Sequence, residues 1–116
     1  MIGFSWACSG EGDVRVPTDR LASEEARTHG RALFLEHCAL CHGEAADGRG
    51  LRRADLSAPP RDLTDPRWRA GTDATHVFRV LRDGLPGTSM PSWRSLSDDD
   101  RWDLTTYVLS VAERGA

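Results

Sequence analysis

The chain has 116 residues, of which 39% are hydrophobic, 7% aromatic and 28% charged, and its formal net charge at pH 7 is −3. This length fits one domain, and the mixed charges exclude a protein that binds nucleic acid through bulk positive charge. Four tryptophans and regularly spaced apolar residues exclude intrinsic disorder, and no segment approaches the about 20 apolar residues that a bilayer-spanning helix needs.

Residues 1–22 are predicted to form an N-terminal tail ahead of a domain over residues 23–116. The second half of this tail is polar and contains glycine and proline, which favours an extended leader without a core of its own. Ala7 and Cys8 resemble a bacterial lipoprotein cleavage site, although Ser5 stands where such sites usually have leucine. Two interpretations stay open: a signal remnant with a lipid anchor at Cys8, or an ordinary apolar tail with a spare thiol.

The first helix is predicted from about Ser23 to Leu40. Ser23 is a suitable N-cap, and Glu24 and Glu25 fall in the positive first turn. Because glycine lowers helix propensity, Gly30 on the apolar face predicts a close crossing by another element. That face comprises Ala26, Gly30, Leu33, Phe34, His37 and Cys38.

The remainder of the chain is predicted to alternate loops and helices. Glycines and prolines interrupt any periodic pattern over residues 43–69, and a loop of this length is expected where it has a function or wraps around something. A second helix is predicted over residues 73–83, ended by Gly84, and a second loop over residues 84–95. The buried side of this helix comprises Val77, Phe78, Leu81 and, less clearly, Val80.

A last helix is predicted to begin after Ser97, with aspartates at 98–100 in its first turn. Its apolar face comprises Trp102, Leu104, Tyr107, Val108 and Val111. No segment alternates polar and apolar residues for long enough to indicate a strand. The sequence therefore predicts an all-α chain with about three helices and two long loops.

The segment CALCH at residues 38–42 matches the C-x-x-C-H signal for covalent attachment of a c-type haem. The thiols of Cys38 and Cys41 lie on one helical turn and can each add to one vinyl group of the same porphyrin, and the imidazole of His42 follows as an iron ligand. A zinc site would need a second pair of ligands, and a thioredoxin-like dithiol would follow a strand. The motif therefore predicts one covalently bound haem c per chain.

A second axial ligand to the iron is predicted at Met90, in the loop over residues 84–95. Gly87 permits close approach to a flat ring, and Pro91 stiffens the backbone beside the methionine. His76 is the competing ligand, but its position at the start of a helix favours a surface residue. His42 and Met90 would together fill both axial positions of the iron.

With these motifs, residues 26–113 resemble the class I cytochrome c family. Gly30 and Phe34 precede the attachment motif as in the family's N-terminal helix, LTTY at 104–107 matches its C-terminal L-x-x-Y/W/F, and MPSW at 90–93 resembles its axial-methionine loop. The resemblance implies a small cytochrome c-like fold, with about three helices and long loops wrapped around one covalently attached haem.

The segment APPRDL at residues 58–63 resembles the family's proline segment, whose carbonyl usually accepts a hydrogen bond from the proximal imidazole. The resemblance therefore implies that Pro59 or Pro60 orients His42. The longer insert ahead of this segment leaves open which of the two prolines does so.

Further haem contacts are expected from side chains that suit the propionates. Trp68 has an indole N–H that needs an acceptor when buried, although a plain packing role is equally open. Arg61, Arg67 and Arg69 are candidates for bidentate pairing with a propionate, and a solvated position is the alternative for each.

Two classes of function follow from the state of the sixth iron position. If Met90 fills it, the protein is an electron carrier, not an enzyme, that shuttles one electron between larger redox proteins. It can do so as a free carrier or as the electron entry or exit subunit of a membrane-associated oxidoreductase complex. If Met90 does not bind, the iron is open, as in a haem enzyme or gas sensor; no acid–base pair flanks the 84–95 loop, so the carrier is favoured.

Location and partners follow from the same reasoning. The resemblance implies haem attachment outside the cytoplasm, in the bacterial periplasm or on the periplasmic face of the membrane. Contact with the membrane would come only through a lipid anchor at Cys8, and no nucleic-acid partner is expected. Redox partners would meet the protein through a small, transient interface.

Overall fold

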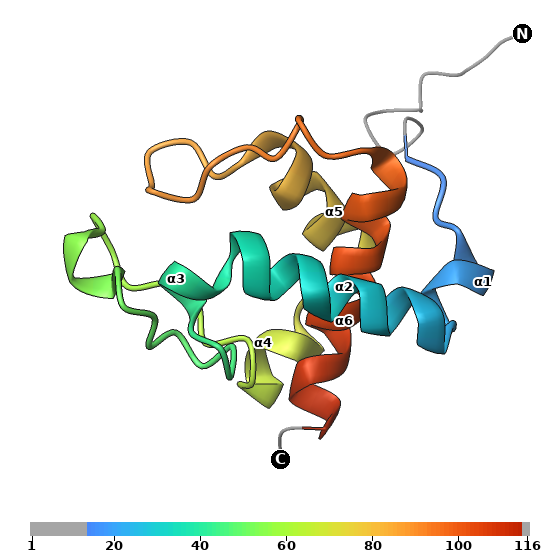
Figure 1. The fold of residues 1–116 in the computed structure, drawn as a ribbon, viewed down its shortest axis with the longest axis horizontal. Helices are drawn as coiled ribbons and strands as arrows, with labels where there is room; N and C mark the ends of the chain where they lie inside the picture. The colour runs from blue at the N-terminus through green and yellow to red at the C-terminus, as the bar shows by residue number, and fades with distance from the viewer. Residues whose placement is uncertain (1–13, 115–116) are drawn as a thin grey trace, which may run out of the picture.

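The computed structural model describes residues 14–114, and this part of the chain contains helices and loops without a strand (Figure 1). The predicted all-α fold is therefore confirmed. No helix within these residues is long and apolar enough to cross a membrane. Cys8, the residue at which a lipid anchor was one of two interpretations, lies outside the described residues. The elements are α1 (Thr18–Leu21), α2 (Glu24–His37), α3 (Ala39–His42), the 3-10 helix η3 (Arg53–Asp55), α4 (Pro66–Ala70), α5 (Ala74–Asp83) and α6 (Asp98–Arg114).

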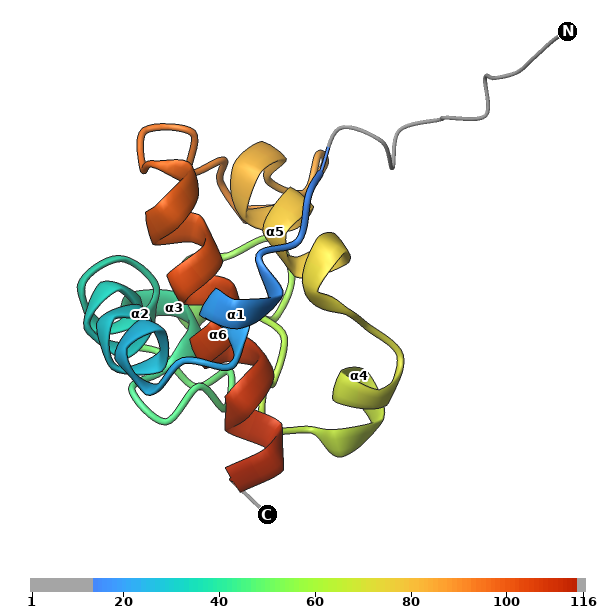
Figure 2. The ribbon, with the colours of Figure 1, turned by 90° about the vertical axis from the view of Figure 1, so that its right-hand side faces the viewer.

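The C-terminal helix α6 forms the centre of the fold, and α1, α2, α4 and α5 all pack against it (Figures 1 and 2). Ser97 caps this helix, because its hydroxyl accepts a hydrogen bond from the Asp100 N–H at 3.0 Å. The predicted apolar face is buried, but all residues from 101 to 108 are buried as well, including the polar ones. An amphipathic pattern predicts one buried face; contacts from several sides bury the polar face of α6 as well.

Helix α2 crosses α6 at Gly30, as predicted. A Cβ at Gly30 would overlap the backbone carbonyl of Asp103 and lie 2.9 Å from the Cβ of Tyr107. One turn later, Phe34 is 1% exposed, and its ring centroid lies 5.3 Å from that of Tyr107. The missing side chain at Gly30 thus lets the two helix backbones touch and brings the aromatic rings together.

The predicted helix over residues 23–40 is interrupted at Cys38, so its C-terminal boundary was wrong. Helix α2 ends at His37, Cys38 has φ −118°, and the chain continues as α3. The Cys38 carbonyl accepts hydrogen bonds from the N–H groups of both Cys41 and His42, at 3.2 and 2.9 Å. The attachment motif therefore closes into a helical turn of its own, set off from α2.

The leader was expected to be extended, but residues 18–21 form α1. Arg20 on this turn donates from Nε to Asp103 Oδ1 at 2.6 Å, and His29 Nδ1 lies 2.7 Å from Asp103 Oδ2. These contacts join residues far apart in the sequence, so local propensity gave no sign of them. The Arg20 contact holds the end of the leader on α6, and the His29 contact joins α2 to the same carboxylate.

Candidate functional site

Of the two thiols of the attachment motif, that of Cys38 lies at the junction of α2 and α3, and that of Cys41 lies within α3. Cys38 is buried and Cys41 is partly buried, and both are free cysteines. Burial, with a smaller contribution from Cys41, raises the pKa of the Cys38 thiol to about 12. Within residues 14–114, no three His, Cys, Asp or Glu side chains cluster in a way that could hold a metal ion.

The imidazole of His42 is oriented by a backbone carbonyl, that of Arg61, which lies 3.1 Å from Nδ1. Because a carbonyl only accepts, Nδ1 carries the proton and Nε2 keeps its lone pair. Burial lowers the pKa of His42, and the hydrogen bond to Arg61 opposes this shift in part. The neutral ring with a free Nε2 is the form that binds a metal ion.

Pro59 or Pro60 was expected to supply this carbonyl, but the residue that does so is Arg61, which directly follows Pro60. The segment is held in register because the Leu63 N–H donates to the Ala46 carbonyl at 2.8 Å, and Gly48 lies against the carbonyl of Pro60. In this register the Arg61 carbonyl reaches His42.

Residues 43–52 close over the C-terminal end of α3. The N–H groups of Gly48, Gly50 and Arg52 donate to the carbonyls of His42, Cys41 and Leu40, at 2.7, 3.1 and 2.7 Å. A Cβ at Gly50 would overlap the backbone of Leu40 and Cys41. The carbonyl groups at the C-terminal end of α3 thus have hydrogen-bond donors in this loop, and these bonds hold the attachment turn in place.

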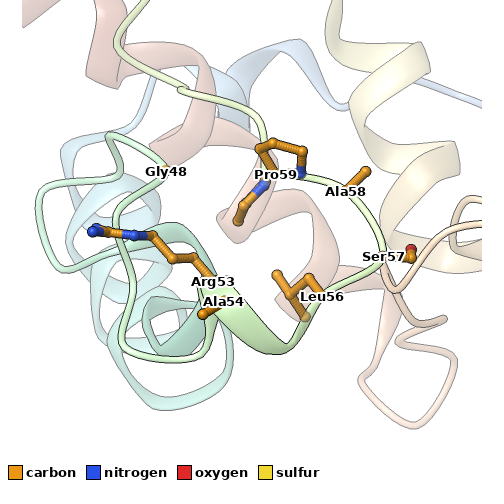
Figure 3. A pocket seen from close by; sticks show the side chains of 8 residues that line it. Gly48, Arg53, Ala54, Leu56, Ser57, Ala58 and Pro59 are labelled. Carbon is orange, nitrogen blue, oxygen red and sulfur yellow. The ribbon is translucent and has the colours of Figure 1, made fainter.

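A pocket of about 420 Å³ lies beside this loop (Figure 3). Leu56 and Pro59 project from the loop that encloses it, and Ser57 lies where the loop after α5 passes close by (Figure 3). The residues that line the pocket are Gly48, Arg53, Ala54, Leu56, Ser57, Ala58, Pro59 and Pro60. Most of these residues are apolar, as a pocket for a flat apolar ring requires.

Met90 lies in a loop that is folded back on itself. The Leu85 N–H donates to the Met90 carbonyl at 3.2 Å, and the Met90 N–H donates to the Thr88 hydroxyl at 3.1 Å. Gly84 has φ +75°, and a Cβ there would lie about 3.0 Å from the Met90 carbonyl oxygen. The Met90 side chain is partly buried and packs against the core cluster that contains Phe34 and Cys38.

The structure brings the loops around His42 and Met90 to the same side of the molecule as α3 (Figure 1). They are linked directly, because the Ser57 N–H donates to the Ser89 hydroxyl at 3.1 Å. The segments that carry the two thiols, the imidazole and the thioether therefore lie on one side of the fold, and none of these four side chains is among those that line the apolar pocket. This donor set fits a covalently attached haem.

The side chains that were expected to contact the haem propionates have three different environments. Trp68 on α4 is partly buried and packs against the core cluster. Arg61 and Arg67 are exposed. Arg69 is bound elsewhere: Nε donates to the Leu109 carbonyl at 3.1 Å, and Nη2 lies 3.3 Å from a Glu113 carboxylate oxygen. His76 is exposed, as predicted for a surface residue.

Sequence reasoning missed Arg101, a buried arginine that binds the C-terminal part of the loop that carries Met90. Its Nη1 donates to the Trp93 carbonyl at 2.8 Å. The sequence did contain a signal, since position 101 lies three residues before Leu104 and seven before Val108, in the register of the apolar face. A charged residue in that register indicates a buried polar contact.

Comparison with known proteins places the chain in a family. Residues 25–108 match the family model described as cytochrome c oxidase, cbb3-type, subunit III. The chain is 36% identical over 100 residues to cytochrome c55X of Paracoccus denitrificans (strain Pd 1222), covering 84% of this chain and 82% of that protein. It is 34% identical over 92 residues to the cbb3-type cytochrome c oxidase subunit CcoP of Azospirillum brasilense, covering 78% of this chain and 29% of the subunit. The chain thus spans less than a third of that subunit.

Solved structures agree with this assignment. A chain of the Kuenenia stuttgartiensis reducing HAO-like protein complex has a TM-score of 0.69 and 33% identity, covering 84% of this chain and 46% of its own length. The KustC0563 c-type cytochrome has a TM-score of 0.60 and 28% identity, covering 71% of this chain and 95% of its own length. These neighbours share the all-α fold.

Proposed function

The chain belongs to the cbb3-type cytochrome c oxidase subunit III family of c-type cytochromes, and from this premise we propose that it transfers single electrons through one haem c. The thiols of Cys38 and Cys41 would hold this haem covalently, and His42 and Met90 would ligate its iron. A haem so bound supplies a one-electron Fe(III)/Fe(II) couple. The chain holds the ligands in place and keeps the site apolar.

The contact between His42 and Arg61 is the observation that carries this proposal. A carbonyl at 3.1 Å from Nδ1 fixes both the tautomer and the plane of the ring, so Nε2 is presented in one orientation. The same contact makes His42 a stronger donor, because the proton on Nδ1 is shared with an acceptor. The two thiols on the same turn fix where a porphyrin can lie relative to this nitrogen.

Support for Met90 as the second ligand comes from the loop that carries it. The backbone N–H and carbonyl of Met90 are both hydrogen-bonded, and its side chain is partly buried against the same core cluster as Cys38. A thioether ligand favours Fe(II) and raises the reduction potential relative to a second histidine. If His42 and Met90 both ligate the iron, the site would transfer electrons without binding a substrate.

The partners are proposed to be larger redox proteins. The CcoP relatives are named as subunits of a cbb3-type oxidase, and this supports a place for the chain within or beside such a complex. Cytochrome c55X, which the chain matches over most of its length, supports a separate carrier instead. Either role is proposed for the bacterial periplasm or the periplasmic face of the membrane.

The test is an absorption spectrum of the oxidised and dithionite-reduced protein, with and without CO. Ligation by His42 and Met90 predicts a weak far-red band in the oxidised protein and sharp reduced bands that CO does not change. Met90→Ala should remove the far-red band and allow CO to bind, whereas the matched variant His76→Ala should leave both unchanged. CO binding to the unmodified protein would instead indicate an open iron and a ligand-binding or catalytic haem.

A further inference from the structure

Arg101 is a charged residue on the buried side of α6. Its side chain is only 8% exposed, and its guanidinium carbon lies 5.5 Å from the centroid of the Phe78 ring. Within residues 14–114, its Nε has no hydrogen-bond partner. Burial of a guanidinium lowers the stability of the fold unless hydrogen bonds to its nitrogens compensate for the lost hydration. The hydrogen bonds of the other two nitrogens of Arg101 therefore decide whether this position is stable.

The other two guanidinium nitrogens hold the segment that joins the Met90 loop to α6. Nη1 donates to the Trp93 carbonyl at 2.8 Å and also to the Leu96 carbonyl, and Nη2 pairs with the Asp98 carboxylate. One planar fork thus binds two backbone carbonyls and one carboxylate at once. A lysine at this position has a single nitrogen and a flexible stem, and cannot hold the same three acceptors in a fixed geometry.

Trp93 is the point where this loop is fixed to both neighbouring helices. The backbone N–H of Trp93 donates to the Leu81 carbonyl of α5 at 2.7 Å, and the backbone carbonyl of Trp93 accepts from Arg101 of α6. Trp93 follows Met90 by three residues, with the rigid Pro91 between them. The position of Met90 relative to the core therefore depends on where Arg101 and Leu81 hold Trp93.

We infer that Arg101 is a positioning residue that keeps the Met90 sulfur in place as an iron ligand, acting through the backbone of Trp93. The inference rests on the proposed function, since it requires that Met90 bind the iron. Without the guanidinium, the C-terminal end of the loop loses its attachment to α6. Met90 then leaves the iron in a larger fraction of the molecules, and an external ligand can take its position.

The test compares Arg101→Gln with the matched control Arg20→Gln, each as the haem-loaded protein. Arg20 also forms a charged contact to α6, but on Asp103 and away from the Met90 loop. Arg101→Gln should raise the apparent binding constant of the reduced protein for CO about tenfold and weaken the far-red band, because a charge-assisted hydrogen bond that holds the ligated state is lost. Arg20→Gln should lower the urea midpoint while leaving CO binding and the far-red band unchanged.

Unchanged CO binding in Arg101→Gln, together with a lowered urea midpoint, would make Arg101 a structural residue and overturn the inference. If Arg101→Gln does not accumulate, Arg101→Lys is measured in its place. A smaller rise in CO binding is expected there, and CO binding equal to that of the unmodified protein would again overturn the inference. Strong CO binding by the unmodified protein would refute ligation by Met90, and the role of Arg101 with it.

Discussion

Arg20 and Asp103 are separated by 83 positions in the sequence, and Arg20 Nε donates to Asp103 Oδ1 at 2.6 Å. The Asp103 side chain is 2% exposed and that of Arg20 is 38% exposed. The hydrogen bond to Asp103 is the largest factor that raises the pKa of Arg20 above its ordinary value. This pair, with His29 as a second partner of the carboxylate, fixes α1 and the end of the leader on the central helix.

The first prediction concerns this buried carboxylate. Asp103→Ala should lower the free energy of unfolding by about 2 kcal/mol, because two close partners lose a charged acceptor in a buried position. Urea unfolding of the haem-loaded protein measures the change. Arg27→Gln is the control, since Arg27 pairs with Glu24 on the exposed surface of α2 and should change stability little. Equal losses in the two variants would show that Asp103 contributes no more than a surface pair.

The second prediction concerns the crossing of α2 and α6. Gly30→Ala should lower the free energy of unfolding by about 3 kcal/mol, because the added methyl group overlaps the Asp103 carbonyl and forces the helices apart. Thermal unfolding followed by circular dichroism gives the measurement. Gly71→Ala is the matched control, as its Cβ would meet no atom closer than 3.7 Å. A Gly30→Ala protein as stable as the Gly71→Ala protein would contradict the close crossing.

The third prediction concerns the loop that closes over α3. Gly50→Ala should reduce the fraction of chains that carry covalent haem, because its Cβ would overlap the backbone of Leu40 and Cys41 and displace the attachment turn. Mass spectrometry of the purified chains distinguishes those with and without haem. Gly71→Ala again serves as the control and should be fully loaded. If all Gly50→Ala chains carried covalent haem, the prediction would be wrong, and the attachment turn would not depend on close contact with Gly50.

The fourth prediction concerns pH. Burial lowers the pKa of His42 below its ordinary value of 6.5, so the folded chain binds this proton less readily than the unfolded chain does. The favourable contribution of neutral His42 to stability is therefore present above pH 6.5 and is lost as the pH falls through the lowered pKa. Ligation by His42 opposes protonation further, and the low-spin spectrum should persist below pH 6.5. An acid titration of the Soret band tests this, and conversion to high spin at or above pH 6.5 would contradict it.

The sequence alone was sufficient for the features that depend on local spacing. The attachment motif at 38–42 needs residues on one turn, so five consecutive letters predict it. The buried faces of α2, α5 and α6 follow from the 3.6-residue period, and Ser23 and Ser97 cap their helices as predicted. Gly30 predicted a crossing because a glycine within an apolar face has little other use.

The tertiary structure decided the features that depend on contacts between distant segments. Arg61 rather than Pro59 or Pro60 orients His42, because the pairing of Leu63 with Ala46 sets the register of a loop whose length no local rule fixes. The leader has a place on α6 because Arg20 meets Asp103 across most of the chain. Periodicity counts neighbours along one helix, whereas these contacts depend on where other segments meet it, and that is decided only when the whole chain is packed.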